Sequence, residues 1–240
     1  IENVSMKKIL ATLLLTLPSI SMAIDLEGYY ITAKGGASKT FNTGTTSFNR
    51  ANGALRTFQN EDLGTGSAFG FSVGKYITDS FRLELEAIKR TGYEYDAAWT
   101  DGPDFTEKAK IQTEALFVNG FYDFQPFIMS NTAITPYLGG GVGISRNKMG
   151  TIHQYENGIS DDNFYNGDTI NQFAYKLSAG TLVSMTDNFS LDLNYQYVNL
   201  GAFKGGPYRF GATEETMQMG YNGGEIKTQE LMVGLQYTFK

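Results

Sequence analysis

Apolar and polar residues alternate strictly in two segments near the C-terminus of the chain. Between residues 189 and 197, Phe, Leu and Tyr occupy the odd positions, and Ser, Asp, Asn and Gln occupy the even positions. Residues 230–239 repeat the alternation, with Leu, Val, Tyr and Phe at the odd positions. A period of two places the two sets of side chains on opposite faces of a β-strand and does not fit a helix. We therefore expect a chain built from two-faced strands.

Six further segments have strand-like patterns, which brings the expected total to eight strands. They comprise residues 29–38, 68–76, 81–90, 111–124, 136–146 and 172–184. In the strand at 111–124, Glu114 and Asn119 favour opposite registers, and a bulge between them would reconcile the two. The register of this strand is left open.

The connections between these strands alternate in length. Residues 77–80 and 185–188 form tight turns, whereas the connections at 39–67, 91–109, 147–171 and 201–225 are long. Outer-membrane barrels pair short periplasmic turns with long outer loops, and such long connections are rare in soluble domains. The predicted fold is therefore all-β: an eight-stranded antiparallel up-and-down transmembrane β-barrel with four long extracellular loops.

The N-terminal segment has the pattern of a secretory leader. Lys7 and Lys8 precede an apolar run at residues 9–17, and Ser21-Met22-Ala23 follows. The run is about half of the ~20 residues that a membrane-spanning helix needs. We expect residues 1–5 to be an upstream artefact, 6–23 a signal peptide and 24–240 an outer-membrane β-barrel domain, with its loops at the bacterial cell surface.

Composition excludes several classes of site. The chain has no cysteine, which rules out disulfides, thiolate metal sites and cysteine nucleophiles. Its formal net charge of -6 does not favour nucleic acid as a partner. We expect stability to come from closure of the sheet.

The sizes of the side chains indicate which face of the barrel is inside. The interior of an eight-stranded barrel is just wide enough for packed side chains, and the aromatic rings of the apolar face would crowd it. We therefore expect the apolar face outside and the polar face in the lumen, with its cations paired to its acids because an unpaired buried ion costs several kcal/mol. Such a network predicts a plug rather than a pore. Its expected members are Lys34, Arg82, Glu84, Glu86, Lys176, Asp192 and Glu230.

No motif in the chain predicts catalysis, a cofactor or a metal. The glycine-rich run at residues 139–143 lacks the Lys-Ser/Thr of a phosphate-binding loop and is better suited to close strand packing. His153 is the only histidine and lies in a polar loop. The acidic residues between 161 and 168 miss the EF-hand spacing. We expect no enzyme activity, no cofactor and no bound metal.

Aromatic residues within the long loops are candidates for contact with a protein partner. The alternative, packing of the loops against one another, is equally consistent with the sequence. The set comprises Trp99, Phe105, Tyr155, Phe164, Tyr165, Phe203, Tyr208 and Phe210.

Several strand segments resemble a known family. They are Gly28-Tyr-Tyr-Ile, Phe81-Arg-Leu-Glu-Leu-Glu, Asn119-Gly-Phe-Tyr-Asp-Phe, Pro136-Tyr-Leu-Gly-Gly-Gly-Val-Gly and Phe173-Ala-Tyr-Lys-Leu. In order and type they resemble the opacity-type and rickettsial surface-antigen family of small outer-membrane barrels. The resemblance implies a non-catalytic surface antigen, some members of which bind host molecules. The ending with Tyr237 and Phe239 looks like the signal read by the barrel-assembly machinery.

The leading functional hypothesis is a structural surface barrel whose loops are antigenic and candidates for adhesion. Its expected partners are outer-membrane lipid and lipopolysaccharide, the assembly machinery and a host surface or matrix molecule. The alternatives are an outer-leaflet enzyme using His153 and the acidic loops, a narrow porin using the charged lumen, and a soluble periplasmic carrier.

Overall fold

The computed structural model describes residues 25–41, 45–49, 55–59, 63–99, 102–211, 216–217 and 221–240. The predicted leader lies outside these residues. In the described part of the chain, no helix has the length and apolar character needed to span a bilayer. Eight long strands dominate it: β1 (Tyr29–Thr40), β4 (Thr65–Thr78), β5 (Phe81–Trp99), β6 (Gly102–Asp123), β8 (Thr132–Met149), β10 (Ile159–Ser184), β11 (Phe189–Arg209) and β13 (Tyr221–Thr238).

These eight strands pair in chain order and close into a ring. Each pairs with the next in an antiparallel register, from β1–β4 through to β11–β13. The ring closes where β1 pairs with β13 over 11 positions, from Tyr30 opposite Thr238 to Thr40 opposite Thr228. Closure satisfies the backbone groups that an open sheet edge would leave unpaired. The predicted eight-stranded up-and-down topology is confirmed.

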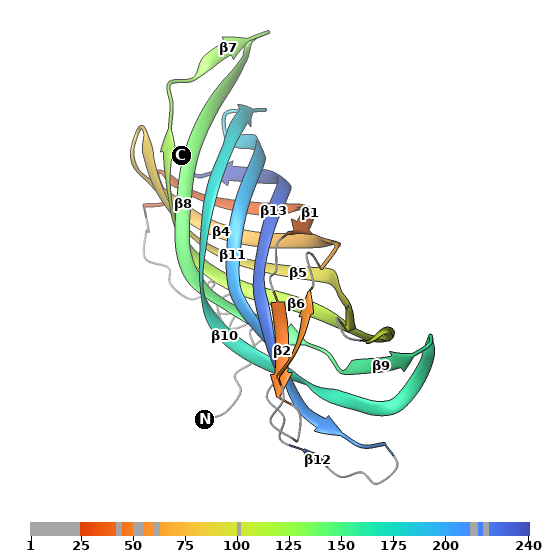
Figure 1. The fold of residues 1–240 in the computed structure, drawn as a ribbon. Helices are drawn as coiled ribbons and strands as arrows, with labels where there is room; N and C mark the ends of the chain where they lie inside the picture. Colours follow the sequence, from red (N-terminus) through yellow and green to blue (C-terminus); the bar gives the residue numbers. More distant parts are fainter. Residues whose placement is uncertain are drawn as a thin grey trace.

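The two ends of the ring differ in elaboration (Figure 1). The short rim carries the tight turns, the C-terminus and one projecting hairpin, in which β7 (Phe127–Met129) pairs with the start of β8. The long rim carries β2 (Thr45–Asn49), β3 (Leu55–Gln59), β9 (Ile152–Glu156) and β12 (Thr216–Met217).

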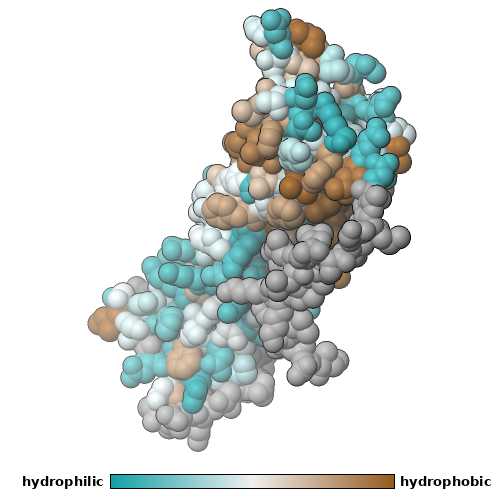
Figure 2. Space-filling view, turned by 180° about the vertical axis from the view of Figure 1, so that it is seen from behind, coloured by the Kyte–Doolittle hydropathy of each residue, from teal (hydrophilic) through white to brown (hydrophobic). Residues whose placement is uncertain are grey.

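The outer face of the ring is apolar along the half nearer the short rim. Phe69, Leu85, Val118, Leu177 and Leu231 are all exposed there. Their partners in the alternation, such as Glu84 and Lys176, are buried inside. Figure 2 shows apolar side chains gathered over the upper half of one face, with hydrophilic ones prevailing below. This distribution is what a lipid-facing belt requires.

The register of β6 is now settled. Its odd residues, including Asn119, are buried in the lumen, and Glu114 lies on the outer face. Pairing with β5 runs without interruption from Lys89 opposite Glu114 to Phe81 opposite Tyr122, so no bulge separates Glu114 from Asn119. Asn119 is held inside because its amide donates to Glu84 and Glu86, at 3.1 and 3.0 Å.

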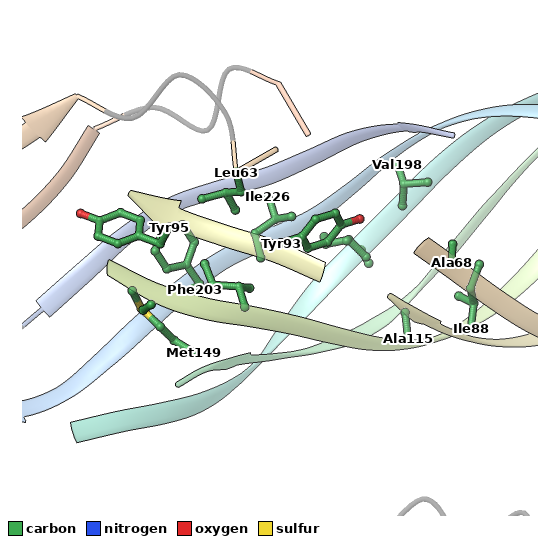
Figure 3. Close-up of a cluster of buried hydrophobic side chains, with 14 of the residues drawn as sticks. Leu63, Ala68, Ile88, Tyr93, Tyr95, Ala115, Met149, Val198, Phe203 and Ile226 are labelled. Carbon is green, nitrogen blue, oxygen red and sulfur yellow. The ribbon is translucent and has the colours of Figure 1, made fainter. Parts of the chain in front are cut away.

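Much of the four predicted loops consists of strand rather than of irregular chain. For example, β5 and β6 continue together to Trp99 and Gly102, well beyond the predicted strand ends at residues 90 and 111. Inside this extension the lumen is mainly apolar, although Glu107, Asn147 and Gln154 are also buried there. Figure 3 shows Leu63, Tyr93, Tyr95, Phe203 and Ile226 gathered between the strands, and all are at most 2% exposed. The extension therefore has a hydrophobic core and a polar exterior, the reverse of the belt.

Two glycines interrupt the alternation of apolar and polar residues where the strands pass into the extension. Gly92 in β5 and Gly201 in β11 have φ of 90° and 72°, and the strand register shifts beside each of them. As a result Arg90 and Tyr93 both point inward, although they differ in parity. The bulge moves the inward face from even to odd positions and interrupts the period of two.

We expect Gly92→Ala to destabilise the extension by about 1–2 kcal/mol, because an L side chain rarely adopts a positive φ. Limited proteolysis of the folded barrel in detergent should show faster cleavage within the extension. Gly120→Ala is the matched control, since its Cβ would come no closer than 3.5 Å to its neighbours and its φ is not positive. Equal cleavage rates in the two variants would contradict the bulge argument.

Candidate functional site

The half of the lumen inside the apolar belt is filled by charged and polar side chains. They come from strands on all sides of the ring, because every second residue of each strand points inward. Glycines on the inner face leave space for large side chains from other strands. A Cβ atom at Gly74 would overlap the ring of Tyr30, and one at Gly180 would overlap the ring of Tyr137.

Glu86 lies at the centre of this network. It forms ion pairs with Lys34 on β1, at 2.9 Å, and with Lys176 on β10. Lys34 also lies 3.6 Å from Glu84. The carboxylate of Glu86 therefore links strands that are not neighbours in the sheet, and its side chain is fully buried. Two cations and two acids balance each other within this layer.

Nearer the short rim, Arg82 closes the lumen. Its guanidinium donates from Nε to Asp123 at 3.1 Å and from Nη1 to the Tyr30 hydroxyl at 3.3 Å. The same group lies 4.4 Å from the ring centroid of Phe121 and 4.7 Å from that of Tyr137. Ion pairing and cation–π contact together hold a large cation across the channel.

Nearer the long rim, Arg90 and Glu230 form a second closure. Arg90 donates to both carboxylate oxygens of Glu230, at 2.5 and 3.1 Å, in a two-point pair. Ser38 and Gln196 also donate to Glu230, at 2.7 and 2.5 Å. Both partners of the pair are fully buried. The apolar core of the extension begins directly above this pair.

The structure places all seven candidate lumen residues inside the ring, but not always with the predicted partners. Lys34 and Lys176 meet Glu86, whereas Arg82 pairs with Asp123 and Glu230 pairs with Arg90. Asp192 accepts a hydrogen bond from Tyr137 at 2.6 Å instead of an ion pair among the described residues. Sequence reasoning missed Arg90 and Asp123. Arg90 shares the even parity of Arg82 and Glu86, and Asp123 lies on the strand whose register was open.

The candidate loop aromatics are distributed between the two predicted roles. Tyr165 and Phe203 are 1% and 2% exposed, so the expectation that they contact a partner is wrong for both. Phe203 packs edge-on against Tyr95 in the core of the extension, and Tyr165 packs on Tyr208 with ring centroids 4.8 Å apart. Tyr155, Phe164, Tyr208 and Phe210 are half-buried. The side chains of Trp99 and Phe105 lie outside the described part.

A depression of about 470 Å³ lies on the outer wall of the extension, between β5, β6 and β9. Lys108 and His153, opposite each other across β6 and β9, both line it. Lys108 donates to Asp96, 3.0 Å away, and this hydrogen bond raises the pKa of the lysine. No group of His, Asp or Glu side chains among the described residues could hold a metal ion. The depression can offer mixed charge and the ring of Tyr155 to a ligand.

The lumen is expected to be closed to ions, because side chains fill it at three successive levels. In planar bilayers the wild-type barrel should give no discrete conductance steps under conditions in which a general porin does. Regular steps from the purified wild type would contradict a plugged lumen.

We expect Glu86→Gln to lower the free energy of unfolding by about 3–5 kcal/mol, because it leaves two buried ammonium groups short of a counter-charge. The temperature at which the folded band disappears on heat-modifiable gels reports the loss. Glu114→Gln is the matched control, since Glu114 pairs with Lys89 at 3.4 Å on the exposed outer face. Such a pair contributes about 0–1 kcal/mol. Equal losses in the two variants would contradict the role of Glu86.

Comparison with known proteins agrees with this architecture. "Outer membrane protein PagN" of Salmonella typhimurium is 27% identical over 237 residues, covering 89% of this chain and 90% of that protein. "Putative adhesin RC1281" of Rickettsia conorii is 28% identical over 182 residues, covering 72% of this chain and 68% of that protein. The crystal structure of OprG from Pseudomonas aeruginosa has the same fold, with a TM-score of 0.53, 12% identity and coverage of 89% and 97%.

The family assignment follows from the match along the chain. Residues 9–239 match the family described as "Outer membrane protein beta-barrel domain". The closed eight-strand ring and its apolar belt are the structural form of that assignment. The chain belongs to the outer membrane protein beta-barrel family and resides in the bacterial outer membrane.

Proposed function

We propose that this protein is a surface-displayed adhesin without chemistry of its own, in which the barrel serves as a rigid base and the extension presents the contact surface. The observation that carries the proposal is the extension itself. Its strands continue the barrel wall and enclose an apolar core, so its outer residues are held in fixed positions well beyond the lipid belt. A surface of this kind is preorganised for binding, which lowers the entropic cost of association.

The lumen supports a structural role for the barrel. The ion pairs centred on Glu86, Arg82 and Glu230 occupy the channel, and those of Glu86 and Glu230 link strands that are not neighbours in the ring. A filled lumen disfavours transport and favours a stiff base. His153 is exposed in the depression that it shares with Lys108 and Tyr155, and among the described residues no hydrogen bond joins its ring to a hydroxyl or a carboxylate. This arrangement does not favour the alternative of an outer-leaflet enzyme.

The hairpin of β9 and β10 supplies the most suitable contact surface. It turns at Asn157 and Gly158, both with positive φ, and Figure 1 shows it projecting from the long rim. Ile159 follows the turn and is 74% exposed. A large apolar side chain at the tip of a rigid hairpin is the kind of anchor that protein partners bury. Half-buried Tyr155 and Phe164 lie on the same hairpin.

The names of the relatives support the same function. A relative from Rickettsia conorii and another from Rickettsia felis are each called a putative adhesin. We extend this role to the present chain, with a host surface or matrix molecule as partner. Biogenesis would involve removal of residues 6–23 and recognition of Tyr237 and Phe239 by the barrel-assembly machinery.

Ile159→Asp should reduce attachment of bacteria that display the protein to host cells by about tenfold, as expected when a central apolar anchor is lost. The matched control is Ile128→Asp on the β7–β8 hairpin, where an isoleucine 69% exposed lies at the opposite rim. Counts of attached bacteria, normalised to the folded protein in the outer membrane, give the comparison.

The control variant is expected to attach like the wild type. Undiminished attachment by Ile159→Asp and by a variant with residues 152–164 replaced by a short Gly-Ser turn would refute adhesion through this hairpin. Equal losses for Ile159→Asp and Ile128→Asp would show an effect on assembly instead and would also count against the proposal.

A further inference from the structure

The geometry points to a binding site for the phosphate groups of lipopolysaccharide on the outer wall of the barrel, formed by Lys110, Arg146 and Lys148. This site lies below the hairpin tip and is independent of host-cell attachment. It would fix the barrel to the glycolipid of its own membrane.

The three cations lie directly above the lipid belt. On β8, Ile144 is 64% exposed at the edge of the belt, and Arg146 and Lys148 are the next two outward residues. Ile144 is flanked on the belt by Leu116 of β6 and Phe173 of β10, which are 48% and 66% exposed. The cations therefore occupy the level at which acyl chains give way to headgroups.

The strand register places the three cations next to one another. Arg146 and Lys148 are two residues apart on one face of β8, a spacing of about 7 Å. Lys148 pairs with Gln112 of β6, so Lys110 is its diagonal neighbour on the same face. Diagonal neighbours are separated by about 7–8 Å. Long cationic side chains at these spacings can converge on one phosphate or span two.

In the described part of the chain these cations form no ion pair, whereas several other exposed lysines beyond the belt are paired. Lys89, Lys204 and Lys227 each lie within 3.6 Å of a carboxylate. Two carboxylates lie opposite cations of the site in the register: Glu114 faces Arg146 but is engaged by Lys89, and Glu94 faces Lys110. The three cations and Glu94 together still carry a net positive charge. Among the described residues, Lys39 on β1 and Lys75 near the short rim are also exposed and form no ion pair, but neither has a second such cation beside it.

The wall above the cations is also hollowed. The depression between β5, β6 and β9 begins at Lys110 and Gly150 and continues to His153 and Tyr155. A glycolipid whose phosphates bind the three cations would extend its sugars along this wall. The lining includes the carboxylates of Glu94 and Asp96 and the ring of Tyr155, which suit sugar hydroxyls and sugar rings but not phosphates. An anionic phospholipid would satisfy the cations but leave the depression unfilled.

The test uses the purified full-length barrel in neutral detergent and measures its affinity for lipopolysaccharide, for the same lipopolysaccharide after removal of its phosphates, and for phosphatidylglycerol. Neutralising Lys110, Arg146 and Lys148 to Gln should weaken binding of intact lipopolysaccharide by about a hundredfold at low salt. The matched control neutralises Lys39, Lys204 and Lys227, which lie on β1, β11 and β13 away from the site, and should bind within about twofold of the wild type.

Removal of the phosphates should weaken wild-type binding to the level of the triple variant. The proposal is overturned if the triple variant binds intact lipopolysaccharide like the wild type, if phosphate removal has no effect, or if phosphatidylglycerol binds the wild type equally well. Preferential binding of a soluble sulfated polysaccharide would also overturn it, since the site would then serve an external polyanion. Attachment to host cells is a separate readout, so this inference can fail without the adhesin proposal failing.

Discussion

Each long strand of this protein passes from lipid into water part of the way along its length, and the rest of the structure depends on that transition. In the belt, lipid solvates the outer face, so bulky apolar side chains point outward and charges are confined to the lumen. Above the belt, water solvates the outer face, and the hydrophobic effect places apolar side chains inside. The same strands thus enclose a polar interior within the belt and a mainly apolar interior above it.

The polar core can exist only because it is nearly neutral and closely paired. Glu86 faces two lysines, Arg82 faces Asp123, and Arg90 faces Glu230. Burying these ions is costly, and their pairing offsets that cost without making the network a large net source of stability. The network instead fixes the positions of the strands around the lumen. The pairs of Glu86 and Glu230 connect strands that share no register, whereas the pair of Arg82 and Asp123 joins the neighbouring strands β5 and β6. Together they stabilise the barrel below the extension.

The sequence predicted the belt better than the extension, for a physical reason. In the belt, strict alternation of apolar and polar residues identifies strands and faces together, so Lys34, Glu86 and Lys176 could be placed inside from their positions. Above the belt, the bulges at Gly92 and Gly201 shift the inward-facing positions from even to odd. Because the alternation is broken there, residues that form strands in the extension were predicted to be loops. The partners of Arg82 and Glu230 were missed because ion pairing depends on the ring's register, which local sequence does not contain. The three cations of the lipopolysaccharide site are likewise brought together only by the register between β6 and β8.

The two faces of the wall exchange polarity at the belt edge, while β5 remains a continuous strand. Because the chain has no cysteine, single cysteines can be introduced along β5 and labelled in intact outer membranes. The account predicts that cysteines at 83, 85 and 87 react only with a lipid-soluble reagent, that those at 94 and 96 react with a water-soluble one, and that those at 93 and 95 are protected. Water-soluble labelling at 93 and 95 with protection at 94 and 96 would contradict the parity change and the apolar core above the membrane.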